Sequence, residues 1–180
     1  MLNGDKMARR SLKQMKEDEE KIITELQRNA RGSIDSIASK FKFSRQKVWR
    51  IIKRLEKTRK IWGYSAVIGE EELNKKRFII LIKRTVEPLD DAISKIIDQI
   101  INKMGEEINV SIECSSFLHG EYDWMFIIVA EDIKHAKRFC NLITRDYNKW
   151  VSDIHLIEDI FSVKKCGIIN PKLNELKEFL

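Results

Sequence analysis

Basic side chains crowd one stretch of the chain in a pattern that suits the binding of a polyanion. The stretch is Ser44–Lys60, with the sequence SRQKVWRIIKRLEKTRK. At 100° per residue Val48, Ile52 and Leu55 fall on one stripe with Ile51 beside them, which predicts a helix with one face packed in a core. On its other side, guanidinium and ammonium groups can pair with phosphates or guanine edges, and a glutamine can pair with adenine.

The elements before this helix decide how it is presented. The sequence predicts two shorter helices, Lys16–Arg28 and Ile34–Phe41, and places Ser33 and Ser44 where N-cap residues belong. The turn between the second and third helices is too short for them to lie antiparallel, so they should cross as in a helix-turn-helix. The run Lys60–Ile68 is β-prone with a glycine bend, which predicts a wing.

A basic run on a helix is most often only a solvated face. Here the helix-turn-helix context favours DNA, because the major groove of B-DNA is about 12 Å wide and admits one α-helix. The candidates for contact with double-stranded DNA are Ser44, Arg45, Gln46, Lys47, Trp49, Arg50, Lys53, Arg54 and Lys57.

The charge of the chain is divided between its two parts. Residues 1–68 contain 18 Lys and Arg against 8 Asp and Glu, whereas residues 69–180 contain 16 against 20. A basic part is typical of a protein that binds a polyanion, and a mildly acidic part should have another role. Within the basic part, the acidic residues 17–20 should open the first helix, where they suit its dipole.

Several classes of protein are disfavoured by composition. No apolar run approaches the roughly 18 residues of a membrane span, and residues 1–14 lack the apolar core of a secretory signal, so we expect a cytoplasmic protein without a membrane partner. Cys114, Cys140 and Cys166 are widely spaced and form no Cys-x-x-Cys motif, which disfavours both a disulfide framework and a zinc site. We therefore expect neither a metal nor a cofactor.

After the polar connector 69–76 the hydrophobic pattern changes to alternating strands and helices. The predicted strands are Arg77–Val86, Asn109–Leu118, Tyr122–Ala130 and Ile154–Val163, and the predicted helices are Leu89–Met104, ended by Gly105, and Ile133–Tyr147. The order βαββαβ is that of a ferredoxin-like domain, so the chain should be an α+β protein. The expected domains are 1–68 (winged helix-turn-helix), 69–76 (linker), 77–167 (ferredoxin-like) and 168–180 (tail, with a small helix after Pro171).

A ferredoxin-like sheet has helices on one face only. The other face would be left open, and an apolar open sheet normally finds a partner, so the sequence predicts a homodimer.

The combined pattern resembles the Lrp/AsnC, or feast/famine, family of transcriptional regulators over roughly residues 16–165. The resemblance is carried by the acid cluster of the first helix, Phe43-Ser44, Arg54-Leu55-Glu56, Ile61-x-Gly63-Tyr64-Ser65-Ala66 and Gly120-x-Tyr122-Asp123. It implies a regulatory module that dimerises through its sheets and assembles further into tetramers or octamers. It also implies a small-molecule effector, commonly an amino acid, bound near the hairpin residues His119, Gly120, Tyr122 and Asp123.

The chain departs from the family pattern in informative places. Arg59 stands where a glycine usually follows the third helix, so either the helix runs on or Arg59 adopts a left-handed conformation. His119 replaces a common threonine before the hairpin glycine. For Tyr122 and Asp123 the alternative to an effector site is a turn-stabilising pair whose carboxylate bonds backbone amides.

An enzyme of the same architecture is the other alternative. Siroheme decarboxylases resemble this arrangement. The segment Tyr122–Phe126 together with His119 is distantly similar to the strand and the catalytic histidines of those enzymes. An enzyme has no use for a strongly basic N-terminal part, so we favour a non-enzymatic DNA-binding regulator.

Overall fold

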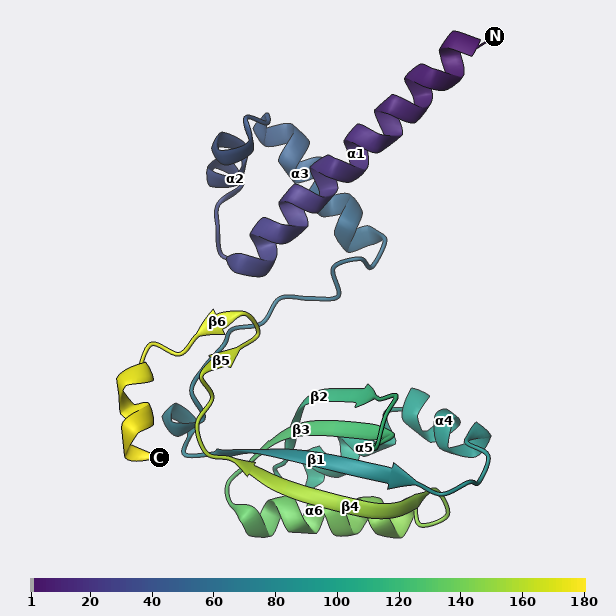
Figure 1. Cartoon of the computed structure of the whole chain (residues 1–180), viewed down its shortest axis with the longest axis vertical. Coiled ribbons are helices and arrows are strands. Elements are labelled where there is room, and N and C mark those ends of the chain that lie inside the picture. The colour runs from purple at the N-terminus through teal and green to yellow at the C-terminus, as the bar shows by residue number, and fades with distance from the viewer. Residues whose placement is uncertain (1) are drawn as a thin grey trace. The chain divides into compact units, whose positions relative to one another are not determined.

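The computed structural model describes the backbone of residues 2–180 and the side chains from residue 12 onward. The chain divides into two compact units (Figure 1). The first contains the residues up to Val67 together with Lys164–Asn170, and the second contains Ile68–Val163 and Pro171–Leu180. The end of the chain therefore contributes to both units.

The first unit is built on three helices: α1 (Leu2–Arg28), α2 (Ile34–Phe41) and α3 (Arg45–Lys57). Both predicted N-caps are confirmed, since the hydroxyl of Ser33 accepts from the amide of Ser36 and that of Ser44 accepts from the amide of Lys47. Lys42 ends α2 in a left-handed conformation and turns the chain into α3. The helix-turn-helix expected from the sequence is present.

The first helix is longer than predicted. It begins at Leu2 rather than near Lys16, so the acidic residues 17–20 lie in its interior and not in its first turn. The expected interaction of these acids with the helix dipole is therefore wrong. The physical reason is that residues 2–15 favour a helix strongly enough to extend α1, and the dipole acts only within the first turn.

The core of the first unit lies where the three helices meet. Its buried members are Ile22, Ile37, Ala38, Val48, Ile51 and Leu55. The predicted stripe of α3 contained Val48, Ile52 and Leu55 with Ile51 beside it, but Ile51 is buried and Ile52 only partly so. The centre of the packed face is shifted because α1 and α2 cover the side of α3 that carries Ile51.

The chain leaves α3 through a left-handed residue. Arg59 has φ 54°, and the amide of Lys60 donates to the carbonyl of Leu55 at 3.0 Å, as in a Schellman-type helix end. Of the two alternatives stated for Arg59, the structure shows the left-handed conformation and not a longer helix. Residues 61–69 then run without an assigned strand, so the predicted wing is a single segment and not a hairpin. A lone extended segment has no neighbouring strand with which to form a ladder.

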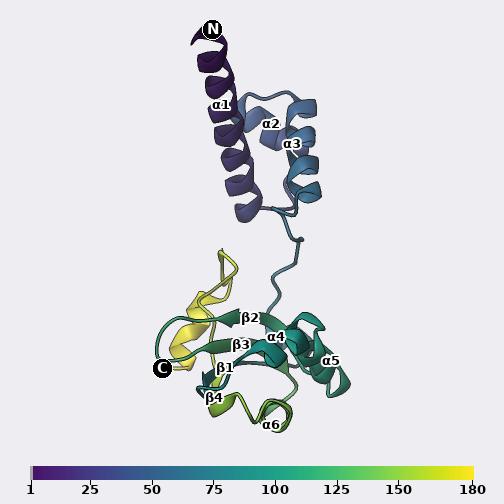
Figure 2. The same cartoon turned by 90° about the vertical axis from the view of Figure 1, so that its right-hand side faces the viewer.

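The second unit is a four-stranded antiparallel sheet in the order β2-β3-β1-β4, with helices on one face (Figure 2). The central pairs are in register at Ile80, which lies opposite Phe126 on one side and Leu156 on the other. This is the predicted ferredoxin-like domain. Its elements are η1 (Glu70–Leu73), β1 (Lys76–Arg84), α4 (Asp90–Ile97), α5 (Ile100–Glu107), β2 (Ser111–Phe117), β3 (Trp124–Ala130), α6 (Ile133–Asp146), β4 (Val151–Asp159) and η2 (Leu173–Glu178).

The first helical region of this unit is broken where a continuous helix was predicted. Gln99 adopts φ 54° between α4 and α5 and separates them. Gly105, predicted to end the helix, lies inside α5, where a Cβ atom would come within 2.7 Å of the carbonyl oxygen of Val110. This glycine is required for close packing against the start of β2 and not for a helix cap.

The last predicted elements are shifted. β4 begins at Val151, before the predicted Ile154, because Val151 pairs with Arg84 at the end of β1. In the tail, two short strands, β5 (Lys164–Lys165) and β6 (Ile168–Ile169), form a hairpin before the 3-10 helix η2. The predicted helix after Pro171 is therefore a short 3-10 helix.

Candidate nucleic-acid interface

The nine candidate residues of α3 and its N-cap fall into two groups by exposure. Seven are exposed to solvent: Ser44, Arg45, Gln46, Trp49, Arg50, Lys53 and Lys57. Lys47 and Arg54 are half-buried on the side that faces α1. The helix therefore presents an outer basic face, defined by the exposed residues Arg45 to Lys57, and an inner basic pair, Lys47 and Arg54.

The inner basic pair is neutralised by α1. Lys47 Nζ lies 2.6 Å from Asp18 Oδ2, and the Asp18 side chain is 5% exposed. Lys47 Nζ also lies 4.0 Å from the ring centre of Phe43. Arg54 Nη2 lies 2.7 Å from Glu19 Oε1, and Lys60 Nζ reaches the other oxygen of the same carboxylate at 2.8 Å. Both carboxylates therefore hold α1 against α3.

The pKa values of these two acids reflect their partners. Burial raises the pKa of Asp18, but hydrogen bonds from Lys47 and Gln14 outweigh it and the pKa lies below its ordinary value. The pKa of Glu19 also lies below its ordinary value. The hydrogen bond from Lys60 and the charge of Arg54 lower this pKa by more than burial raises it. Both side chains are thus held in the charged form that the basic residues require.

Sequence reasoning missed this inner role of the acid cluster. The signal was available, because two adjacent acids stand near a helix with an excess of positive charge. What the sequence could not supply was the crossing of α1 over α3, which decides which basic residues the acids meet.

The outer basic face has only weak internal partners. Arg45 meets Asp35 at 3.2 Å and Lys53 meets Glu56 at 2.8 Å, with both pairs open to solvent. Arg50 Nε donates to the carbonyl of Gln46 at 3.4 Å. Exposed ion pairs contribute about 0–1 kcal/mol, so a polyanion can displace them at low cost. These side chains can therefore exchange their intramolecular partners for phosphates or base edges.

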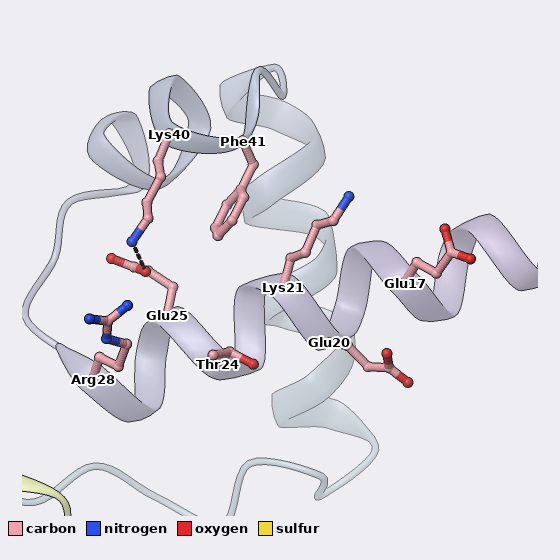
Figure 3. Close-up of a pocket in the computed structure, with 8 residues that line it drawn as sticks. All are labelled: Glu17, Glu20, Lys21, Thr24, Glu25, Arg28, Lys40 and Phe41. Carbon is pink, nitrogen blue, oxygen red and sulfur yellow. Dashed lines mark hydrogen bonds and ion pairs between the residues drawn. The ribbon is translucent and has the colours of Figure 1, made fainter.

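A hollow of about 430 Å³ on the same unit does not extend the basic face (Figure 3). It lies between α1 and α2 and is lined by Glu17, Glu20, Lys21, Thr24, Glu25, Arg28, Lys40 and Phe41. Acidic and basic residues are equally represented, and Lys40 is paired with Glu25. The hollow offers a polyanion no net attraction.

The four candidate effector residues follow β2 in the loop before β3. His119 and Gly120 are exposed, and Tyr122 packs edge-on against His155, with their ring centres 5.5 Å apart. Asp123 is oriented differently: its Oδ2 accepts from the amide of Arg84 at 2.9 Å. The carboxylate therefore bonds a backbone amide, as the alternative interpretation required, but that amide belongs to β1 and not to the hairpin itself.

Beside the hairpin the described part of the structure has one small cavity. Asp123 lines a cavity of about 20 Å³ together with Trp124, Tyr147 and other mainly apolar residues. A cavity of this size holds about one water molecule and no amino acid. Burial raises the pKa of Tyr147 to about 12, so its hydroxyl stays protonated in this apolar setting.

Comparison with known proteins agrees with this geometry. Residues 19–61 match a family described as winged helix-turn-helix DNA-binding. An uncharacterized HTH-type transcriptional regulator of Pyrococcus furiosus is 26% identical over 133 residues, which are 74% of this chain and 82% of that protein. The first unit is a winged helix-turn-helix DNA-binding domain.

Solved structures extend the likeness to both units. An AsnC family transcriptional regulator from Agrobacterium tumefaciens has a TM-score of 0.63 at 16% identity, with 91% of this chain and 98% of that chain covered. A transcriptional regulator from Neisseria meningitidis, solved as a complex with L-Met, has a TM-score of 0.63 at 20% identity and covers 87% and 97%. The chain has the Lrp/AsnC fold. The fold that the resemblance implied is confirmed.

In this Lrp/AsnC fold the sheet of the second unit leaves one face without helices. Phe78, Ile80 and Ile82 of β1 enter the core beneath the helices, so the alternate residues Ile79 and Leu81 face the other way. The same alternation places Met125, Ile127 and Ile157 on this open face. Its centre is apolar.

Charged pairs frame the open face. At one end of β1, Arg77 meets Asp159 at 2.6 Å and Glu113 at 2.9 Å. Burial lowers the pKa of Arg77, but the hydrogen bonds to these two carboxylates outweigh burial, so the pKa lies above its ordinary value. Toward the other end, Lys83 meets Glu121 at 3.0 Å. An apolar centre with a polar rim is typical of a protein interface.

Two further classes of site do not occur in the part of the chain that the structure describes. It contains no group of three or more His, Cys, Asp or Glu side chains placed to hold a metal ion. It also contains no helix long and apolar enough to cross a membrane.

Proposed function

We propose that this protein is a sequence-specific DNA-binding transcriptional regulator that inserts α3 into the major groove. The observation that carries the proposal is the division of α3 into an outer basic face with weak partners and an inner basic pair neutralised by α1. Such a division leaves the exposed side free for DNA while the other side holds the helix in place.

We assign roles within the outer basic face by chemistry and position. Gln46 and Arg50 lie near the start and middle of α3 and suit base edges, adenine for the amide and guanine for the guanidinium. Arg45, Lys53 and Lys57 suit phosphates, and Trp49 suits the backbone side of the groove. The hydroxyl of Ser44 is already engaged as the N-cap, so its contribution would be to position the first turn.

We infer that two copies associate through the open face of the sheet. Ile79, Leu81 and Ile127 would be shielded from water there, and burial of apolar area is the main driving force of such association. Two-fold symmetry would then set two α3 helices on half-sites about one helical turn apart, or a multiple of it. Larger assemblies, tetramers or octamers, would be built from these dimers.

We also propose regulation by a small molecule such as an amino acid near His119–Asp123. The support is the L-Met complex of the structurally similar Neisseria regulator, together with the small size of the cavity beside the hairpin, which favours a site completed by another subunit. Asp123 connects this hairpin to the backbone of β1, so a ligand that engages it would act on a central strand. The protein would then act in the cytoplasm by binding and not by catalysis.

The decisive test of DNA binding is selection of bound fragments from genomic DNA, followed by titration of the selected duplex and a scrambled duplex. We expect a pseudo-palindromic site and a strong preference for the selected duplex. Equal affinity for both duplexes would contradict a sequence-specific function. In the same assay, Gln46→Ala should change which bases are preferred, whereas Glu20→Ala on the outside of α1 should not.

The regulatory proposal has a separate test. Amino acids are screened by their effect on the melting temperature, and any binder is titrated again with the selected duplex present. Because binding couplings are reciprocal, an effector that changes DNA affinity must have its own affinity changed by DNA in the same ratio. Asp123→Ala should abolish this coupling. A bound amino acid that leaves DNA affinity unchanged would show that the hairpin is structural.

A further inference from the structure

We propose that the N-terminal half of α1 is a second DNA-contacting element, which binds phosphates beside the groove occupied by α3. The inference deepens the proposed DNA-binding function and rests on it. The segment 2–16, here called the α1 arm, lies before residue 19, where the match to the winged helix-turn-helix family begins. The architecture of that domain therefore does not account for it.

The charge of the α1 arm is almost entirely positive. Its sequence contains Lys6, Arg9, Arg10, Lys13 and Lys16 against one acidic residue, Asp5. Within the part whose side chains the structure describes, Lys13 and Lys16 are both exposed. Acidic residues begin to gather only at residue 17, where α1 reaches the packed body of the unit. Positive and negative charge are thus segregated along one helix.

The α1 arm continues directly into the part of α1 that packs against the inner side of α3. Asp18 and Glu19 hold α1 against α3 through their ion pairs, and Ile22 is fully buried in the common core. Both views of the molecule show the N-terminal half of α1 extending past α2 and α3 as one continuous helix (Figures 1 and 2). When α3 enters a groove, the position of the arm is therefore fixed as well.

The length of the α1 arm suits a phosphate backbone. A helix rises 1.5 Å per residue, so 15 residues span about 22 Å. This is roughly two-thirds of a 34 Å turn of duplex, a span over which the backbone presents several phosphates. Contacts of this kind neutralise charge and carry no sequence information.

DNA fits the α1 arm better than a second copy of the chain does. Leu12 and Met15 are exposed there, at 58% and 41%, and offer some apolar surface to a second copy. Two arms lying side by side would bring two sets of five positive charges together, and like charges on neighbouring helices repel. A polyanion relieves this repulsion, whereas a second arm increases it.

The test compares two variants that remove the same amount of charge. The arm variant is Arg9→Gln, Arg10→Gln, Lys13→Gln and Lys16→Gln, and the control removes four positive charges from the second unit, Lys103→Gln, Lys134→Gln, Lys137→Gln and Arg138→Gln. Both are titrated, with the unaltered protein, against the selected and scrambled duplexes between 50 and 200 mM salt. For the arm variant we expect the slope of log affinity against log salt to fall by about 2–4, at about 0.9 for each phosphate that is no longer neutralised.

The affinities should change in a matching way. At 100 mM salt the arm variant should bind both duplexes at least about 100-fold more weakly, and the control less than about threefold more weakly. A charge-preserving variant, Arg9→Lys, Arg10→Lys, Lys13→Arg and Lys16→Arg, should keep the original slope. If the neutral variant has less helix by circular dichroism, Lys13→Gln with Lys16→Gln alone provides the comparison, with about half the change in slope.

Three results would overturn the inference: an unchanged slope in the arm variant, an equal weakening in the control, or a change of oligomeric state by light scattering without a change of slope. The last would assign the α1 arm to contacts between copies. These results are distinguishable from failure of the proposed function, which would appear as equal affinity of the unaltered protein for the two duplexes.

Discussion

The two sides of α3 carry the same kinds of residue and have different environments. On the outer side Arg50 bonds a carbonyl of its own helix, whereas on the inner side Arg54 meets the carboxylate of Glu19 at 2.7 Å. Lys53 and Lys47 differ in the same way, since Lys53 pairs with the solvent-accessible Glu56 and Lys47 with the buried Asp18. The basic residues of α3 therefore do not form one uniform face: those on the inner side support the fold, and those on the outer side are exposed to solvent.

The largest expected effect is the loss of stability when an ion pair on the inner side of α3 is removed. Asp18→Ala would leave Lys47 half-buried without its carboxylate, and removal of one partner of a largely buried charged pair should cost about 1–3 kcal/mol in the free energy of unfolding. Denaturant unfolding followed by circular dichroism measures this. Glu20→Ala, which removes an exposed acid two residues away, should change stability by less than about 0.5 kcal/mol. Equal effects of the two substitutions would show that Asp18 has no special role.

Substitution of Arg50 on the outer side and of Arg54 on the inner side should affect different properties, DNA affinity in the first case and stability in the second. Arg50→Ala should reduce affinity for the selected duplex by about 10–100-fold, corresponding to about 1–3 kcal/mol for a base contact, and leave the unfolding free energy unchanged. Arg54→Ala should reduce stability, because Glu19 keeps only Lys60, and should change the affinity of the folded protein little. Fluorescence anisotropy and thermal unfolding of both variants give the comparison. A larger loss of affinity in Arg54→Ala would reverse the assignment of the two sides.

Acid should weaken the ion pairs on the inner side of α3. The pKa values of Asp18 and Glu19 are lowered in the folded protein, from ordinary values of 3.8 and 4.5. The stabilisation they provide is therefore fully present above about pH 5 and is lost as the pH falls through the lowered folded-state values. Unfolding free energies measured from pH 6 to pH 3 should decline, and the double variant Asp18→Asn with Glu19→Gln should show a shallower decline. Parallel declines would exclude these two acids as the cause.

The smallest effect is expected at the end of α3. Arg59 adopts φ 54°, a conformation that costs a residue with a Cβ atom about 1 kcal/mol and costs glycine far less. Arg59→Gly should therefore raise the unfolding free energy by about 0.5–1 kcal/mol, less if the charge of Arg59 contributes to stability. Arg59→Ala is the control, because it removes the same side chain and retains the strain. A glycine variant no more stable than the alanine variant would argue against stored strain.

Local signals determined several features of this protein by themselves. Ser33 and Ser44 start α2 and α3 because a side-chain hydroxyl can cap only the helix that follows it. The order of strands and helices follows from periods of 2 and 3.6 residues. The outer basic face was predictable for the same reason, since the spacing of charged residues along one helix fixes their direction relative to its core stripe.

Tertiary structure decided what depends on a second element. The crossing of α1 over α3 buried Ile51 more fully than Ile52 and placed Lys47 and Arg54 against acids, and no pattern within α3 contains that crossing. Gly105 looked like a helix end because glycine is favoured there, but the approach of Val110 makes it a packing requirement. Asp123 bonds a strand that lies 39 residues earlier in the chain. Such interactions join residues distant in sequence, so their geometry is set only when the whole domain has packed.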